Sequence, residues 1–224
     1  MGTWTSTRRK VLEIVRQEQH RVNSAMTTGL TNRACKDLGR APSCSTCMEA
    51  TKHCCRMYVV TTLLDAIPIA ERVLAMDNTD TLLARLAVHA EQMKTHDCNS
   101  WFDLQLPCVF LADERCSIYD VRPQPCATYL AWSDPRCCSG CNKEQLVTTT
   151  PSLEGSLVVL GCARHLERNL LGIHRDMPMP YTDTLPAAVL TAVNALRSET
   201  EHRFCRVLAE AQTPWEQLEK VRTP

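Results

Sequence analysis

Cysteine is the residue type whose number and spacing suggest chemistry in this chain. The sequence has 14 cysteines among 224 residues, and eleven of them lie between Cys44 and Cys141. Thiolates bind zinc, iron and iron–sulfur clusters, or are joined as disulfides in secreted proteins. The first residues of the chain lack the apolar core of a signal peptide. Dense and closely spaced cysteines therefore favour metal binding over disulfides.

The cysteines fall mainly into two groups and a following pair. The first group lies in "CSTCMEATKHCC", residues 44–55, and the second in "CVFLADERCSIYDVRPQPC", residues 108–126. Two pairs are vicinal, Cys54 with Cys55 and Cys137 with Cys138, and either thiol of such a pair can bind metal while its neighbour packs. The predicted metal ligands are Cys44, Cys47, Cys54, Cys55, Cys108, Cys116, Cys126, Cys138 and Cys141.

Ligand number and spacing distinguish between zinc and iron. Structural zinc sites take four ligands, mostly as two C-x-x-C pairs. Here the pairs 44/47 and 138/141 have that spacing, and one zinc site made from them would leave five candidate thiols unexplained. A [4Fe–4S] cluster takes four thiolates that can come from loops at irregular spacings. The sequence therefore favours at least one iron–sulfur cluster, with zinc as the alternative.

The two groups together resemble a cysteine-cluster family of zinc- or iron-chelating proteins. That family pairs a C-x-x-C…CC group with a later C-x-F-L…C-x-I-Y-x-x-R-P…C group, and the likeness extends over residues 44–141. The spacing between Cys47 and the CC pair is longer than usual, which leaves open whether Cys54 or Cys55 takes the ligand role. The family includes flagellin lysine N-methylases, in which the domain is linked to an iron–sulfur cluster. Most members of the family have no known activity. An iron–sulfur cluster can transfer electrons or bind a substrate, so we expect a redox or catalytic role, in protein or peptide modification.

Two further residues of the second group are predicted to bind the cofactor, Arg122 and Tyr119. A guanidinium cannot coordinate metal, so Arg122 is expected to donate to a carbonyl or a cluster sulfur, or to pair with Asp120 or Asp113. His53, beside the CC pair, is a minor candidate for a ligand or a hydrogen-bond partner. Apolar residues of the motif are expected to keep water from the site, namely Phe110, Leu111, Ile118 and Tyr119.

The apolar pattern around the cysteines predicts a mostly α-helical fold with little or no β-sheet. Thr62 and Asp65 resemble a capping box that opens a helix, although Pro68 could instead place its start near Ile67. The prolines between 98 and 142 predict irregular loops there, with a short turn or strand around 117–119. Helices are expected over residues 6–39, from about 62, over 77–97 and 152–174, and as one long helix over 184–211.

Three segments are predicted to organise the chain. They are an N-terminal helical segment (1–43), a cysteine-cluster metal-binding domain with two helices (44–142) and a C-terminal helical segment (143–224) packed on the same core. Cys35, Cys162 and Cys205 lie on expected helices, where packing is the default interpretation.

Composition excludes several function classes. The net charge is zero, which argues against a broad nucleic-acid surface, and no apolar run is long enough to span a bilayer. Seven glycines leave little room for a phosphate-binding loop, and no catalytic triad is recognisable, so no catalytic residue is assigned. We expect a cytoplasmic protein with an unidentified protein or peptide partner. Two classes remain open: a redox or catalytic iron–sulfur protein, and a structural zinc protein whose helices bind a partner.

Overall fold

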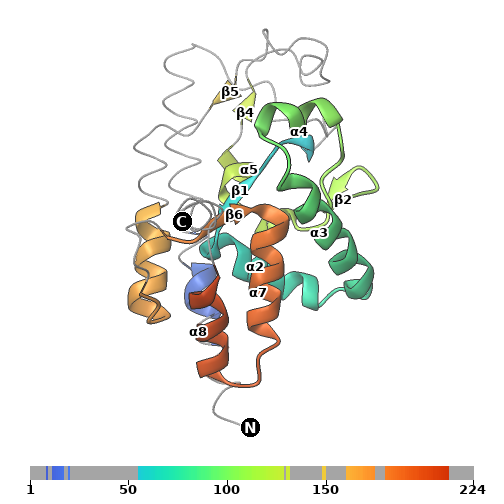
Figure 1. Cartoon of the computed structure of the whole chain (residues 1–224). Helices are drawn as coiled ribbons and strands as arrows, with labels where there is room; N and C mark the ends of the chain where they lie inside the picture. Colours follow the sequence, from blue (N-terminus) through green and yellow to red (C-terminus); the bar gives the residue numbers. More distant parts are fainter. Residues whose placement is uncertain are drawn as a thin grey trace, which may run out of the picture.

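The computed structural model describes residues 9, 12–17, 20, 55–128, 130–131, 148–149, 160–174 and 180–211 (Figure 1). Residues 12–17 are helical. Most of the helix expected over 6–39 lies outside the described residues, as do both predicted segment boundaries, at 43/44 and 142/143.

The chain is mostly α-helical, as predicted. The described strands form three two-stranded antiparallel sheets: β1 (Val60–Thr62) with β6 (Thr182–Thr184), β2 (Leu111–Ala112) with β3 (Arg115–Cys116), and β4 (Leu130–Ala131) with β5 (Thr148–Thr149). The helices are α2 (Leu63–Leu74), α3 (Thr79–Met93), α4 (Cys98–Leu104), α5 (Gln124–Thr128), α7 (Leu185–Leu196) and α8 (Glu201–Glu210), with a 3-10 turn η3 (Tyr119–Val121) and a π-helical turn η6 (Leu166–Leu170).

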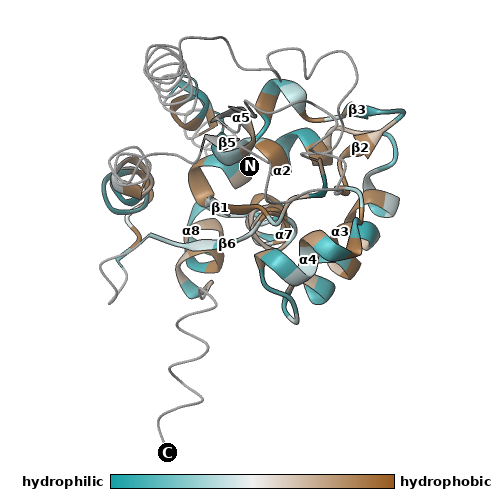
Figure 2. Cartoon of the chain, turned by 90° about the horizontal axis from the view of Figure 1, so that it is seen from above, coloured by the Kyte–Doolittle hydropathy of each residue, from teal (hydrophilic) through white to brown (hydrophobic). Residues whose placement is uncertain are grey.

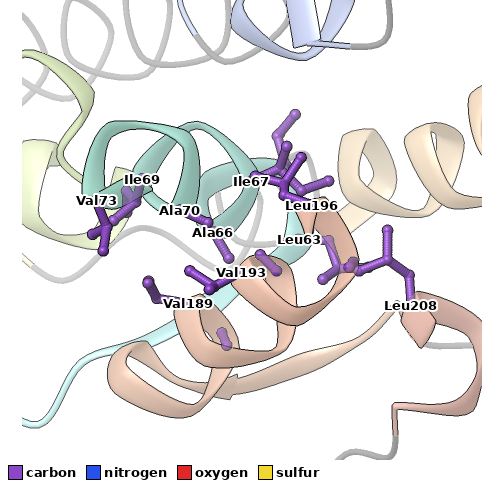
Figure 3. Packing of buried hydrophobic residues seen from close by; sticks show 14 of the residues in the cluster. Leu63, Ala66, Ile67, Ile69, Ala70, Val73, Val189, Val193, Leu196 and Leu208 are labelled. Atoms are coloured by element: carbon purple, nitrogen blue, oxygen red, sulfur yellow. The ribbon is translucent and has the colours of Figure 1, made fainter. Parts of the chain in front are cut away.

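Helix α7 is the centre of the core, because it packs against α2, α3 and α8. Its sequence is apolar on most of its circumference, as expected for a helix with neighbours on several sides. Small residues let α2 and α7 approach closely, and Ala66, Ala70, Ala188 and Ala192 are fully buried. Figure 3 shows α2 residues meeting Val189 and Val193 of α7. In Figure 2 the hydrophobic residues gather between these helices, and hydrophilic ones lie on outer turns of α3 and α4.

Helix α2 begins at Leu63, directly after Thr62, and not near Ile67, the other predicted start. The predicted capping box is wrong: the N-cap Thr62 makes no side-chain cap bond, and Asp65 instead accepts from the Thr61 hydroxyl at 3.1 Å. Pairing of β1 with β6, which extends through Thr62, fixes how the chain enters the helix. Pro68 lies inside α2, where its missing N–H removes one helical hydrogen bond without ending the helix.

Helix α3 follows the prediction over 77–97. Its predicted stripe is buried at Leu82, Leu86, Ala90 and Met93, and Leu83 is half-buried. No helix among the described residues combines the length and hydrophobicity needed to cross a bilayer.

The stretch 98–142 is more regular than predicted, because α4 occupies its start. Asp97 caps this helix by accepting the N–H groups of Asn99 and Ser100 at 3.0 and 2.8 Å, and the Ser100 hydroxyl accepts the Asp97 N–H at 2.9 Å. Asp97 and Ser100, followed by the buried Trp101 and Phe102, are a sequence signal for the start of a helix. The prolines of this stretch led to a prediction of loops, and the signal was missed.

The long helix predicted over 184–211 is also wrong, since α7 and α8 are separate helices. The chain leaves α7 after Leu196, and Thr200 starts α8 by accepting the Arg203 N–H with its side chain at 3.2 Å. A threonine side chain that bonds nearby backbone groups offers an alternative to continuing a helix. Phe204 and Leu208 of α8 are then buried against the core.

Removing the cap of α8 should lower stability. Thr200→Ala leaves the Arg203 N–H without its side-chain acceptor, and we expect the free energy of unfolding to fall by about 1 kcal/mol. Thr200→Ser keeps a hydroxyl and should stay close to wild type. Urea denaturation measures both variants, and an equal loss in the serine variant would show that the cap is not the cause.

Asp183, in β6, should make stability depend on pH. Burial raises the pKa of its carboxyl, although the Thr184 N–H and the Tyr181 hydroxyl donate to it at 2.6 and 3.2 Å. A raised folded-state pKa means that the folded protein binds the proton more tightly than the unfolded chain. The protonated Asp183 therefore contributes its full stabilisation when the pH is below the pKa of the unfolded chain. This stabilisation is lost as the pH rises through the pKa of Asp183 in the folded protein. Asp183→Asn should remove this loss in urea midpoints measured upward from about pH 4, whereas Asp77→Asn on the exposed surface should not.

Candidate metal centre

Four of the predicted ligands lie in the described residues and come from four separate segments. Cys55 lies in the turn before β1, Cys108 follows α4, Cys116 ends β3, and Cys126 lies in α5. The Cys108 N–H donates to the Cys55 carbonyl, which joins the two cysteine groups directly. The thiols also interact electrostatically: Cys55, Cys108 and Cys116 each contribute to raising the pKa of Cys126, and Cys55 and Cys116 act likewise on Cys108. These four thiols are therefore near enough to interact electrostatically.

A tight hairpin brings Cys116 back toward Cys108. Its two turn residues, Asp113 and Glu114, both have positive φ, at 46° and 67°, as a type I′ turn requires. The hairpin register places Cys116 opposite Leu111. The hairpin is closed by Ser117, whose N–H and hydroxyl donate to the Phe110 carbonyl at 2.8 and 3.0 Å.

The hydrophobic core anchors the loop that carries these cysteines. Phe110 and Ile118 are each 1 % exposed and belong to the same core as α2 and α7. Beyond Ile118 the chain turns through η3, where the Val121 N–H donates to the Ile118 carbonyl at 3.0 Å. It then enters α5, where the Cys126 N–H donates to the Pro123 carbonyl at 2.9 Å. Core packing on one side of each cysteine thus sets where the thiols lie.

The chemistry of these thiols fits a metal centre. Burial raises the pKa of Cys108 to about 12 and raises the pKa of Cys116 and, more strongly, of Cys126. Without a cation these groups are neutral thiols at pH 7, and buried neutral thiols are poor nucleophiles. Metal binding must displace their protons and supplies the positive charge that stabilises thiolates.

Arg122 and Tyr119 lie beside this cluster. The Arg122 guanidinium carbon is 4.2 Å from the centroid of the Tyr119 ring, and the Arg122 charge opposes the rise in the pKa of Cys116. Asp120 pairs with Arg72 of α2 at 3.3 Å. Tyr119 is 45 % exposed, so it does not shield the site from water as predicted. Its ring instead packs against the Arg122 guanidinium. Arg122 is therefore placed to stabilise the Cys116 thiolate.

Arg122→Ala should leave metal bound but make it easier to remove. Loss of a group that stabilises a ligand from outside typically weakens metal affinity by roughly 10–100-fold. We expect faster metal transfer to a chelator, followed by absorbance, with the same starting metal content. Arg115→Ala, in exposed β3, is the matched control. Equal transfer rates in the two variants would exclude this role for Arg122.

One acidic residue at this centre escaped sequence analysis. Asp65 is 1 % exposed in α2, and its charge contributes to raising the pKa of Cys126. The sequence signal is a single aspartate within the otherwise apolar run "LLDAIPIA". The Thr61 hydroxyl donates to this buried carboxylate at 3.1 Å.

The other predicted ligands, Cys44, Cys47, Cys54, Cys138 and Cys141, lie outside the described residues, as do Cys35 and His53. Cys162 and Cys205 are half-buried against the core, and Cys98 is exposed at the start of α4. Among the described residues alone, no three Cys, His, Asp or Glu side chains form a group that could hold a metal ion.

Residues 43–152 match the model of the CxxCxxCC family, described as a "putative zinc- or iron-chelating domain". These residues, just under half of the chain, are thus similar to that domain and are referred to as the CxxCxxCC domain. All four described cysteines of the cluster and all five remaining predicted ligands fall inside the CxxCxxCC domain. The family description supports metal binding, by zinc or iron. No curated protein and no solved structure matches the chain.

Proposed function

We propose that the CxxCxxCC domain holds a [4Fe–4S] cluster whose ligands come from its predicted cysteines, Cys55, Cys108, Cys116 and Cys126 among them. The observation that carries this proposal is that four predicted ligands from four segments lie in the region that matches a chelating domain, where Cys55, Cys108 and Cys116 act electrostatically on Cys126. One cubane cluster takes four thiolates, and loops at irregular spacings commonly supply them. Zinc sites more often use paired C-x-x-C turns, which these four residues do not form.

The protein's own residues would tune such a cluster. Phe110 and Ile118 lie at the buried side of the loop, Arg122 supplies a positive charge near Cys116, and Asp65 supplies a negative charge near Cys126. When bound, the cluster would supply electron transfer, or a Lewis-acidic iron if one thiolate were missing. Charges and burial around a cluster set its potential.

We propose a redox or catalytic role in a reducing, cytoplasmic environment, acting on an unidentified protein or peptide. A reducing compartment keeps cysteine thiols available as metal ligands.

Thiol alkylation tests the ligand set. In protein purified without oxygen, iodoacetamide should label Cys98 rapidly and leave Cys55, Cys108, Cys116 and Cys126 unlabelled, as read by peptide mass spectrometry. Exposure to air should bleach a brown protein and make the four sites reactive or disulfide-bonded. Rapid labelling of the four thiols in protein that still holds its metal would refute the proposed ligand set.

A further inference from the structure

The hairpin that carries Cys116 ends in a turn whose residues suit it poorly. Asp113 and Glu114 occupy the two central positions, with φ of 46° and 67°. Both positions of a type I′ turn require positive φ, and Asn-Gly is a preferred pair there. Aspartate tolerates the left-handed region because its short side chain can bond nearby backbone, but a longer side chain such as that of Glu114 is strained there. The closed turn is therefore held against the conformational preference of its own residues.

Few contacts within the hairpin hold this turn closed. Strands β2 and β3 share two residue pairs, Leu111 with Cys116 and Ala112 with Arg115. In the described part of the chain no third strand extends this sheet, and residues 112–115 are exposed. Figures 1 and 2 show the hairpin at the periphery of the molecule. A two-stranded hairpin is marginally stable by itself, so the closed tip depends on what holds its ends.

The base of the hairpin is fixed, and Cys116 lies between this base and the exposed tip. Phe110 is buried in the core, and the Ser117 N–H and hydroxyl both donate to its carbonyl. Cys108 lies on the fixed side of Phe110, where its N–H donates to the backbone of the other cysteine group. Movement of residues 111–116 would therefore displace Cys116 while Cys108 stays in place.

We propose that Cys116 is the labile ligand of the metal centre, because strain at Glu114 favours the open hairpin while the bond from the metal to Cys116 holds it closed. This inference rests on the proposed function for the role of Cys116 as a ligand, but it holds for zinc as it does for iron. When the hairpin opens, the metal–sulfur bond breaks with both electrons left on sulfur, and the thiolate takes a proton from water. The metal keeps its oxidation state and is left with one open position, where water or a substrate can bind.

Glu114→Gly tests the strain in the full-length, metal-containing protein. Glycine adopts positive φ without steric cost, so the closed hairpin becomes more favourable. We expect metal transfer to a chelator, followed by absorbance, to be roughly fivefold slower than in wild type, the factor that corresponds to about 1 kcal/mol of relieved strain. Glu114→Ala is the matched control, because it removes the carboxylate but keeps a side chain at the strained position. Its transfer rate should equal or exceed the wild-type rate.

Amide hydrogen exchange gives a second readout, which does not depend on release of the metal. In the metal-containing proteins, residues 111–116 should exchange roughly fivefold more slowly in Glu114→Gly than in wild type, for the same reason, whereas α7 should not change. Gln105→Gly relieves a left-handed residue outside the hairpin, at the end of α4, where φ is 51°. It should slow neither metal transfer nor exchange in the hairpin.

Unchanged metal transfer and hairpin exchange in Glu114→Gly would overturn the proposal. An equal slowing in Glu114→Ala would also overturn it, because the effect would then come from the lost carboxylate. Cys116→Ser separates these failures from failure of the proposed function. If Cys116→Ser loses metal while Glu114→Gly behaves like wild type, Cys116 is a ligand but not a labile one. If Cys116→Ser keeps metal at the wild-type level, the proposed ligand set is itself wrong, and the labile ligand is excluded with it.

Discussion

Cys126→Ser is expected to remove most of the metal from the purified protein, and Cys108→Ser and Cys116→Ser should do the same. Each change deletes a thiolate from a cluster of four thiols. Even loss of an outer partner of a metal site costs roughly 10–100-fold in affinity, and loss of a ligand should cost more. Because ligation supplies folding free energy, these variants should also be less soluble. Metal per chain, measured on variants purified side by side, gives the result.

Cys98→Ser and Cys205→Ser are the matched controls. Cys98 is exposed on α4 inside the CxxCxxCC domain, and Cys205 is half-buried on α8 outside it. Both should keep metal near the wild-type level, because neither thiol takes part in the cluster. Equal metal loss in a control and in Cys116→Ser would mean that the centre is assigned to the wrong residues.

Phe110→Ala should be among the most destabilising single substitutions in the core. The ring is 1 % exposed and joins the cysteine loop to the core of α2 and α7. Deleting a buried phenylalanine ring typically lowers the free energy of unfolding by about 3–5 kcal/mol, a large part of the roughly 5–15 kcal/mol of an ordinary domain. Urea denaturation of the metal-containing protein measures the loss. Val88→Ala, 56 % exposed on α3, should change stability by less than about 0.5 kcal/mol.

Comparison with Phe204→Ala separates stability from metal binding. Phe204 is equally buried, but it lies on α8. Both variants should lose similar stability, and Phe110→Ala alone should also release metal faster to a chelator, since the Phe110 ring fixes the hairpin of Cys116 to the core. If either alanine variant does not fold, Phe110→Leu and Phe204→Leu make the same comparison. Equal metal release from the two would show that Phe110 contributes only to general stability.

Local sequence patterns predicted some elements of the fold and misjudged others. Helix α3 was predictable because its apolar residues recur with the helical period, although its N-cap Asn78 makes no side-chain cap bond. The break before α8 was not, because Phe204 and Leu208 continue the apolar spacing of α7 and conceal the cap at Thr200. Thr62 looked like a cap because the sequence could not show that β6, more than 100 residues later, pairs with β1.

Some residues of the candidate site were also predictable from the sequence, and others were not. Cys108, Cys116 and Cys126 were predictable because thiols at short spacings carry their own signal. Asp65 has no such spacing, and its relevance comes from the fold, which brings α2 near Cys126. Single charged residues become interpretable only when the fold supplies their neighbours.

Iron, zinc and acid-labile sulfide, measured per chain in protein purified without oxygen, test the central claim most directly. A [4Fe–4S] cluster in the CxxCxxCC domain predicts about four irons and four sulfides per chain, with little zinc. Stoichiometric zinc without sulfide, in a colourless and air-stable preparation, would contradict it.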